Sequence, residues 1–366
     1  MQLLRPHPGT RGRTLAAEEL LLLAPMDDDA DTALTRALDA GGFEFERRGP
    51  LMDLGCVDQS LPALSALLTG RIPPALQSRV KGTMASAAEA DADLSAALLR
   101  AEPLPVFFEQ VEVAWARAAL EDGWLFSVFQ PIVEARTGSI FAYESLIRAQ
   151  PPGTDDVIGA GQLIHACQRL NLYHQLDQRA RVTAIRSAAA LALGETRLFV
   201  NFSPRAIYDP AVCLRGTMAA AEQHGVSMGQ LVFEVQDLDQ VESRERLCCV
   251  LDHYRGKGAG IALDHVDGSL SSLEYLAELL PDYVKIDQTL TSAAATSRGG
   301  RRRLEAVAEL ARRLGVRVVA SGVEDFDQMH AAMECRADYL QGYLIARPAS
   351  PPEPMRPEVL RLLLAA

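Results

Sequence analysis

From residue 125 onward, short apolar segments of strand length alternate with longer segments in which apolar residues recur at helical spacing. This alternation is typical of buried parallel strands joined by helices. The strand patterns cover residues 125–133, 140–148, 197–202, 230–236, 260–266, 283–287, 317–322 and 339–344. The helical patterns cover residues 162–193, 211–224, 243–257, 272–280, 301–314 and 327–335. Eight strands with intervening helices in about 240 residues predict an α/β fold, a TIM-like (β/α)8 barrel, with a doubly wound open sheet as the alternative.

Charge and composition exclude several classes of protein. Lys plus Arg is 36 and Asp plus Glu is 48, so the net charge of −12 argues against affinity for a nucleic-acid polymer. No G-x-G-x-x-G turn follows the first strand pattern and no P-loop occurs. Residues 1–13 contain no apolar core of signal-peptide length, and the apolar runs 20–24 and 362–366 are too short to span a bilayer. The six cysteines are scattered without a C-x-x-C pair, so we expect a reduced, cytoplasmic protein without membrane contact.

The residues before the barrel pattern divide into two regions. Residues 1–60 predict a small α/β module, with strands at 19–24 and 43–47 and a helix from residues 27–31 to about residue 40. This module is either a sensory or regulatory domain or a packing appendage. Residues 61–106 are rich in Ala and Leu and predict a helical connector, which leads into the barrel domain at residues 107–366.

Polar residues lie at or beside the ends of the predicted strands. In a barrel the C-terminal strand ends form one rim, where function is concentrated. An oxygen-rich set of Glu, Asp and Asn suits a hard divalent cation such as Mg²⁺ or Mn²⁺. Spacing alone leaves a network of structural ion pairs as the alternative. The residues are Glu144, Asn201, Glu234, Asp264, Lys285, Glu324 and Gln341.

Ordered motifs accompany these residues. They are Gln130-Pro131-Ile132, Glu144-Ser145-Leu146-Ile147-Arg148, Val200-Asn201-Phe202-Ser203-Pro204, Phe233-Glu234-Val235, Ala262-Leu263-Asp264, Asp282-Tyr283-Val284-Lys285-Ile286-Asp287, Ser321-Gly322-Val323-Glu324, Asp338-Tyr339-Leu340-Gln341-Gly342-Tyr343 and Arg347-Pro348. In order and spacing they resemble the EAL domain family, from about residue 107 to about residue 350. The resemblance does not cover the first hundred residues.

This resemblance implies a cyclic di-GMP phosphodiesterase fold. Active members use two Mg²⁺ or Mn²⁺ ions to hydrolyse cyclic di-GMP to linear pGpG, by polarising the phosphoryl group and activating a water. By position, the metal ligands are Glu144, Asn201, Glu234 and Asp264. Lys285, which supports the attacking water, and Glu324 match catalytic residues. The implied ligand-binding set is Gln130, Glu144, Leu146, Arg148, Asn201, Ser203, Asp264 and Gln341, with Arg148 as the phosphate partner.

Three departures from the family pattern concern catalysis. Family members carry a second aspartate where this chain has His265, and a glutamate where it has Ser321. In the loop at residues 266–273 the glycine stands at a different position from the family's, which changes the residue that can adopt a positive φ. The family implies a homodimer through this loop, and the altered loop weakens that expectation. Asp267 is a candidate substitute ligand, because in an extended chain it points to the same side as His265. The signature Glu-Ser-Leu in place of Glu-Ala-Leu keeps the carboxylate.

Three hypotheses follow. The first is a degenerate EAL domain, not an enzyme, with a vestigial Lys285 and Glu324 and one cation or none, which binds cyclic di-GMP as a receptor or a protein partner. The second is an active but impaired metal-dependent phosphodiesterase that produces pGpG. The third is an interaction module that has also lost nucleotide binding. We favour the first, because Gln130 and Arg148 remain while two carboxylates are lost.

Overall fold

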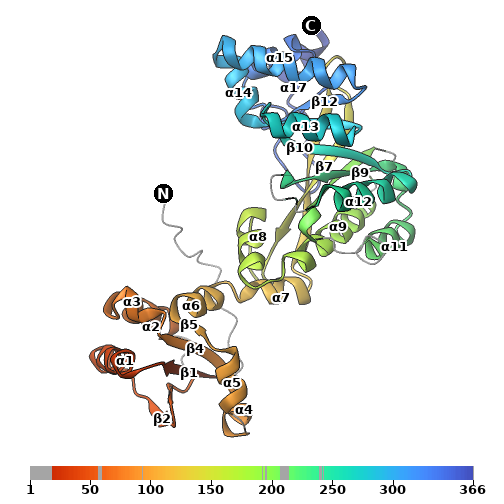
Figure 1. Ribbon diagram of the computed structural model, residues 1–366. Coiled ribbons are helices and arrows are strands. Elements are labelled where there is room, and N and C mark those ends of the chain that lie inside the picture. Colours follow the sequence, from red (N-terminus) through yellow and green to blue (C-terminus); the bar gives the residue numbers. More distant parts are fainter. Residues whose placement is uncertain are drawn as a thin grey trace. The chain divides into compact units, whose positions relative to one another are not determined.

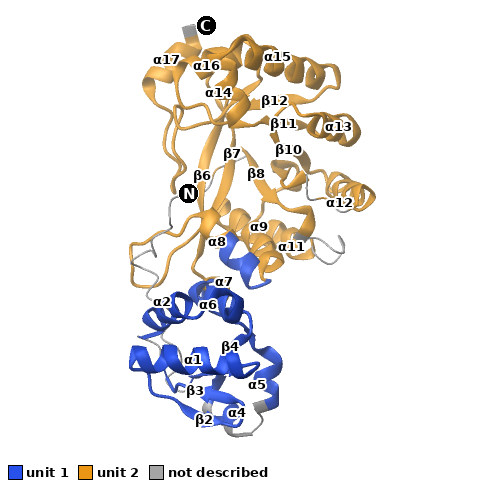
Figure 2. Ribbon diagram, turned by 60° about the vertical axis from the view of Figure 1, so that its left-hand side comes forward, with its two compact units in different colours: residues 1–118, 165–171 blue, residues 119–164, 172–366 orange. Residues whose placement is uncertain are grey.

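The computed structural model describes residues 19–56, 60–92, 94–191, 193, 196–206, 214–238, 241 and 243–365. The expectation for residues 1–13 and the first residues of the predicted helix at 211–224 lie outside this set. The chain forms two compact units, residues 1–118 with 165–171, and residues 119–164 with 172–366 (Figure 2). Two helices, α7 (Trp115–Glu121) and α8 (Ala160–Arg169), are divided between these ranges.

Unit 1 contains a five-stranded sheet in the order β2-β3-β1-β4-β5. Its strands are β1 (Glu19–Pro25), β2 (Glu46–Arg48), β3 (Leu51–Asp53), β4 (Val80–Ser86) and β5 (Glu102–Pro103). Its helices are α1 (Asp28–Gly41), α2 (Leu61–Arg71), α3 (Pro74–Gln77), α4 (Ala87–Ala92), α5 (Leu94–Arg100) and α6 (Leu104–Glu112). Leu21 and Leu23 of β1 belong to one buried cluster and Leu22 and Ala24 to another, so both faces of the sheet are covered.

The region predicted as a helical connector contains a central strand of this sheet. β4 pairs with β1 in antiparallel register from Glu19↔Ser86 to Pro25↔Val80. Residues 61–106 therefore include sheet as well as helix. The strand was missed because its sequence, VKGTMAS, has Gly and Ala where strands usually carry branched residues. Gly82 gives Phe107 of α6 its packing position, since a Cβ there would lie 2.7 Å from the ring.

Unit 2 is a closed eight-stranded barrel with helices outside it (Figure 1). Its strands are β6 (Leu125–Glu134), β7 (Ile140–Ala149), β8 (Arg197–Phe202), β9 (Leu231–Val235), β10 (Gly260–Val266), β11 (Tyr283–Ile286), β12 (Arg317–Ala320) and β13 (Tyr339–Leu340). The further helices are α9 (Tyr173–Ala190), α11 (Arg215–Gln223), α12 (Arg244–Gly256), α13 (Leu270–Leu279), α14 (Gln288–Thr296), α15 (Arg298–Arg313), α16 (Phe326–Glu334) and α17 (Pro357–Ala365). The predicted TIM-like barrel is confirmed, and the open sheet is excluded.

Two details of the barrel differ from the expectation. β6 runs antiparallel to both β7 and β13, because five residues between β6 and β7 are too few for a helical crossover. The single helix predicted at residues 162–193 is two helices, α8 and α9. They are separated at Asn171, which has φ 55°, a left-handed conformation that ends a helix.

Inside the barrel, each strand contributes one residue to an apolar layer. The layer consists of Ile132, Ala142, Phe199, Val232, Ala262, Tyr283, Val319 and Tyr339. Side chains on one face of a strand recur every second residue. The residues two positions toward the C-terminal rim therefore form the next inward-facing layer, and this layer is polar.

Candidate functional site

The polar layer receives one residue from each strand and is called the polar ring here. It consists of Gln130, Glu144, Asn201, Glu234, Asp264, Lys285, Ser321 and Gln341. The residue from β6 lies two positions before Ile132, since that strand runs the other way, and the other seven lie two positions after their apolar partners. Two neighbouring pairs, Gln130↔Glu144 and Asn201↔Glu234, are opposite each other in the strand register. Between other strands the register is offset, so that Glu144 is opposite Phe199 and Glu234 is opposite Ala262. The structure thus brings together most of the residues that the sequence placed at strand ends.

Lys285 supplies the positive charge of the ring. Its Nζ lies 2.5 Å from Glu234 Oε1, 3.1 Å from Glu144 Oε2 and 3.9 Å from Asp264 Oδ1. The lysine is almost fully buried. Burial alone would lower its pKa, but the charges of Glu144, Glu234 and Asp264 outweigh it and raise the pKa above its ordinary value, so the ammonium is retained.

The pKa values of two other central carboxyl groups shift in opposite directions. Burial raises the pKa of Glu234 well above its usual range, and the charge of Asp264 adds to this rise. For Asp264, burial also acts to raise the pKa, but Lys285 and His265 outweigh it and lower the pKa. Lys285 contacts both groups, so its single ammonium balances part of the charge of the ring.

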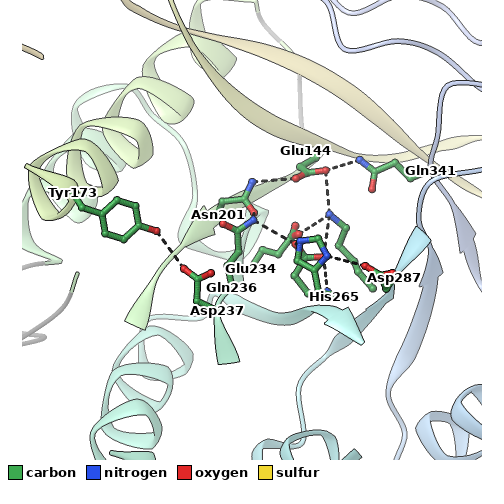
Figure 3. A network of polar contacts seen from close by, with 11 residues as sticks. Glu144, Tyr173, Asn201, Glu234, Gln236, Asp237, His265, Asp287 and Gln341 are labelled. Atoms are coloured by element: carbon green, nitrogen blue, oxygen red, sulfur yellow. Dashed lines mark hydrogen bonds and ion pairs between the residues drawn. The ribbon is translucent and has the colours of Figure 1, made fainter. Parts of the chain in front are cut away.

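Nearly every oxygen of the four implied metal ligands already accepts a hydrogen bond (Figure 3). Glu144 Oε1 accepts from Asn201 Nδ2 (3.0 Å), and Glu144 Oε2 accepts from Gln341 Nε2 (2.6 Å). The Nε2 of Gln236 donates to Asn201 Oδ1 (2.7 Å) and to Asp264 Oδ2 (3.4 Å). Glu234 Oε2 is the exception; it is buried without a hydrogen-bond partner.

This arrangement does not fit a resident divalent cation. A cation would have to displace N–H donors from the oxygens of Asn201 and Asp264, and it would face the Lys285 ammonium across the same carboxylates. Among the residues that the structure describes, no three His, Cys, Asp or Glu side chains are grouped so that they could hold a metal ion. The predicted Mg²⁺ or Mn²⁺ ligands are therefore close together, but they are bonded to the chain's own donors.

His265, which stands where the family has a second aspartate, contacts two carboxylates at the rim. Its Nε2 lies 3.2 Å from Asp264 Oδ2, and its Nδ1 lies 3.1 Å from Asp287 Oδ2. The side chain is 69% exposed and the backbone φ is 54°. Burial acts to lower the pKa of His265, but Asp264 and Asp287 outweigh it and raise the pKa, so the imidazolium is favoured.

Asp267 does not act as the substitute ligand that the sequence allowed. The left-handed backbone at His265 and a register shift between Leu263 and Val266 break the alternation on which that expectation depended. The Oδ1 of Asp267 accepts hydrogen bonds from Ser269 N (2.9 Å) and Ser272 Oγ (3.1 Å), at the start of α13. Its carboxylate therefore organises the loop and does not replace the aspartate that the family has at position 265.

Ser321 and Glu324 follow β12, but only Ser321 belongs to the ring. Its Oγ is buried without a hydrogen-bond partner, at the position where the family has a glutamate. Glu324 is exposed and accepts a hydrogen bond from Gln288 Nε2 (3.0 Å). The structure thus places the predicted catalytic Glu324 outside the group of residues that surrounds Lys285.

The residues implied in ligand binding extend from the ring along β6 and β7. Gln130 accepts from Gln341 Nε2 (3.2 Å) and donates to the carbonyl of Ala346 (3.2 Å). Arg148 is partly buried, and its Nη1 donates to the carbonyl of Ile147 (2.8 Å). Within the described residues Arg148 makes no ion pair, so its guanidinium is available to an anion. Leu146, two residues beyond Glu144, is also partly buried.

Ser203 lies in a second polar cluster, which the sequence analysis did not identify. The backbone N–H of Ser203 donates to Asp177 Oδ1 (2.9 Å), and its hydroxyl donates to Asp237 Oδ2 (3.3 Å). Asp177 forms a buried ion pair with Arg181, one turn later on α9. Tyr173, also on α9, donates to Asp237 (3.4 Å). These contacts hold Ser203, which directly follows β8, and Figure 3 shows Tyr173 and Asp237 of the cluster beside the ring.

Gln236 is the other functional candidate that was missed. The signal was present, because Gln236 is the last residue of the predicted strand at 230–236 and shares the face of Glu234. The motif Phe233-Glu234-Val235 ends one residue before it. No helix among the described residues is long and apolar enough to cross a bilayer.

Comparison with known proteins gives consistent results for the barrel. Residues 113–348 match the EAL domain. The cyclic di-GMP phosphodiesterase NbdA of Pseudomonas aeruginosa is 29% identical over 234 residues, which are 63% of this chain and 30% of NbdA. A standalone EAL protein from Vibrio cholerae, solved in its c-di-GMP bound form, is 29% identical with a TM-score of 0.57, covering 64% of this chain and 97% of that one.

A longer structural likeness reaches beyond the barrel. BlrP1 of Klebsiella pneumoniae, solved as a manganese and cyclic di-GMP complex, is 18% identical with a TM-score of 0.56. It covers 90% of this chain and 96% of that one. At this identity the likeness concerns the fold alone.

Proposed function

The chain belongs to the EAL domain family, and from that membership we propose that its barrel binds cyclic di-GMP as a receptor and does not hydrolyse it. Relatives of this barrel include a cyclic di-GMP phosphodiesterase and an EAL protein solved with c-di-GMP bound. The chain spans only 30% of the length of NbdA, so the activity of that whole protein is not transferred.

One observation carries the proposal that hydrolysis is lost. Lys285, which active family members also carry, pairs with Glu144, Glu234 and Asp264. In this chain Gln236 also donates to the oxygens of Asn201 and Asp264, so the chain's own N–H donors occupy positions that a cation would need. Hydrolysis in this family depends on metal ions that polarise the phosphoryl group and activate water. A lysine provides charge but no open coordination position for a water. The ring is therefore stable without the cations on which the reaction depends.

The substitutions at positions 265 and 321 both favour loss of hydrolysis. Ser321 has no adjacent base that could make it a substitute for a carboxylate, since its hydroxyl is without a partner. His265 lies between Asp264 and Asp287, whose charges raise its pKa, and a protonated imidazole in that place opposes a metal. Loss of a general base alone costs roughly 10²–10⁴ in rate.

Binding depends on different groups from those that activate water. Arg148 has no competing carboxylate partner within the described residues, and its planar fork suits a phosphate. Tyr343 is close enough to Arg148 to influence its pKa, and it is 44% exposed at the rim, as a stacking partner for a base would be. Gln130 and Gln341 supply amides in the polar ring.

Calorimetric titration of the full chain with cyclic di-GMP in EDTA tests binding. We expect saturable binding without metal, loss of at least tenfold in affinity for Arg148→Ala, and no change for Arg302→Ala, an exposed arginine of α15. Absence of heat at high micromolar ligand would favour a protein partner instead. A parallel incubation with Mg²⁺ or Mn²⁺ tests hydrolysis, and ready formation of pGpG would exclude the receptor proposal.

A second candidate, an impaired phosphodiesterase, is favoured by one specific observation. Glu234 Oε2 is a buried acceptor without a partner, and the residue lies close enough to Asp264 and Glu144 for their charges to raise its pKa. A cation bound to this oxygen would relieve that cost. This candidate requires slow, Mn²⁺-dependent pGpG formation that EDTA abolishes, whereas the receptor binds cyclic di-GMP equally well in EDTA.

A further inference from the structure

Gln236 occupies a special position above the polar ring. It follows β9 directly, two residues beyond Glu234, and its backbone N–H donates to the carbonyl of Phe202 (3.2 Å). β9 lies between β8 and β10 in the barrel. A side chain on this strand can therefore reach the ring residues of both neighbouring strands, Asn201 and Asp264.

The amide of Gln236 does reach both of them. Its Nε2 donates to Asn201 Oδ1 at 2.7 Å and to Asp264 Oδ2 at 3.4 Å. Below this bridge lies Glu234, whose Oε2 is fully buried and has no hydrogen-bond partner. Three oxygens on three adjacent strands thus face one place, and an N–H group holds two of them.

We propose that Gln236 is a positioning residue that keeps divalent cations out of the barrel, by holding Asn201 and Asp264 with N–H donors where a cation would hold them. An amide nitrogen carries partial positive charge and cannot ligate a cation, so the bridge competes directly with a metal for the same oxygens. Replacing the NH₂ by an oxygen reverses the sign of the interaction. Asn201 Oδ1, Asp264 Oδ2 and Glu234 Oε2, with a carboxylate at position 236, would then form an oxygen cage.

This inference rests on the proposed function in one respect, since both treat the site as one that works without a resident metal. Lys285 stabilises the carboxylates of Glu144 and Glu234, and both the proposed function and this inference include this contact. Gln236 acts separately from Lys285, because its amide donates to Asn201 on β8 and to Asp264 on β10.

The test is Mn²⁺ binding by the full chain without nucleotide, measured from the electron paramagnetic resonance signal of free Mn²⁺. We compare wild type with Gln236→Glu, Gln236→Ala and Gln236→Met, and use Gln223→Glu, an exposed position of α11, as the control for added charge. Changes beside metal ligands typically alter affinity about 10–100-fold, so we expect Gln236→Glu and Gln236→Ala to bind Mn²⁺ at least tenfold more tightly than wild type. Gln236→Met, which keeps the length but removes the N–H donors and supplies no oxygen, should bind Mn²⁺ more tightly than wild type and less tightly than Gln236→Glu. Gln223→Glu should remain like wild type.

Two results would overturn the inference. One is wild-type Mn²⁺ affinity within about twofold of Gln236→Glu; the other is wild-type affinity for Gln236→Met, because loss of the N–H donors would then not release the oxygens. If Gln236→Ala does not fold, the nearly isosteric Glu and Met variants decide. Titration of cyclic di-GMP in EDTA reports on the proposed function independently, so either conclusion can fail while the other stands.

Discussion

Asp287 joins His265 to the start of the following helix. Its Oδ2 lies 3.1 Å from His265 Nδ1, and its Oδ1 accepts a hydrogen bond from the backbone N–H of Thr289 (2.7 Å) as the N-cap of α14. One carboxylate thus ties the rim end of β10 to the N-terminus of α14. The substitution at position 265 is therefore part of a local structure and is more than the loss of a ligand.

Asp287→Ala should destabilise the protein by about 1 kcal/mol, the usual cost of a lost N-cap. Asp287→Asn keeps a capping oxygen but removes the charge that faces His265, so its cost should be smaller. Urea denaturation of the full chain measures both. Equal losses for the two variants would mean that the contact with His265 outweighs the cap.

Restoring both missing carboxylates, in His265→Asp with Ser321→Glu, should produce Mn²⁺-dependent formation of pGpG. The change removes the imidazole of His265 and returns anionic oxygens to β10 and to the end of β12. Product formation by chromatography measures the gain, with each single variant as a control. A doubly changed protein that binds Mn²⁺ but stays inert would place the main defect in the loop at residues 266–273.

Two neighbouring glycines of α15 should respond in opposite directions to alanine. A Cβ at Gly300 would lie 2.1 Å from the carbonyl oxygen of Ala293 in α14, whereas a Cβ at Gly299 meets nothing within 4 Å. Gly300→Ala must push the two helices apart, at a cost of about 1–3 kcal/mol. Gly299→Ala should stabilise by up to about 1 kcal/mol, because alanine favours helix. Thermal unfolding of both variants measures the difference, and similar behaviour would contradict the close packing of α14 and α15.

The polar ring was accessible to sequence reasoning because strand side chains alternate. Once the apolar strands are located, a period of two places Glu144, Asn201, Glu234 and Asp264 on the inner face and at one level. The order of the strands in the barrel follows from their order in the chain. These are local or topological rules, so they do not depend on side-chain detail.

Features that depend on distant partners were not accessible in the same way. β4 was missed because a strand of Gly, Ala and polar residues is specified by its pairing with β1 more than by its own composition. Gln236 could be placed on the inner face, but the sequence does not say that its amide bridges Asn201 and Asp264. The left-handed backbone of His265 likewise separates Asp267 from the ring, against the simple alternation.

The N-cap of α1 gives unit 1 a defined pH dependence. Asp27 accepts hydrogen bonds from Ala30 N (3.0 Å) and Arg79 Nε (2.5 Å), and the backbone bond above all lowers its pKa below 3.8. A lowered pKa stabilises the fold above the unfolded value, and that stability is lost as pH falls through the folded pKa. Asp27→Asn keeps the cap without the charge. Its melting temperature should fall below that of wild type at pH 7, and the gap should close below about pH 3.8. A gap that is independent of pH would contradict this assignment.

The ion pair of Asp177 and Arg181 should be costly to break but inexpensive to remove whole. Both side chains are buried on α9, and Arg181 also donates to Thr217 (3.1 Å). Arg181→Met leaves a buried carboxylate without its partner, which typically costs about 3–5 kcal/mol. Asp177→Leu with Arg181→Met should recover most of that loss, since an apolar pair fills the same space. The double variant also releases the backbone of Ser203, so its affinity for cyclic di-GMP should fall although its stability returns. Urea unfolding and calorimetric titration measure the two effects, and additive losses of stability would show that the pair is not coupled.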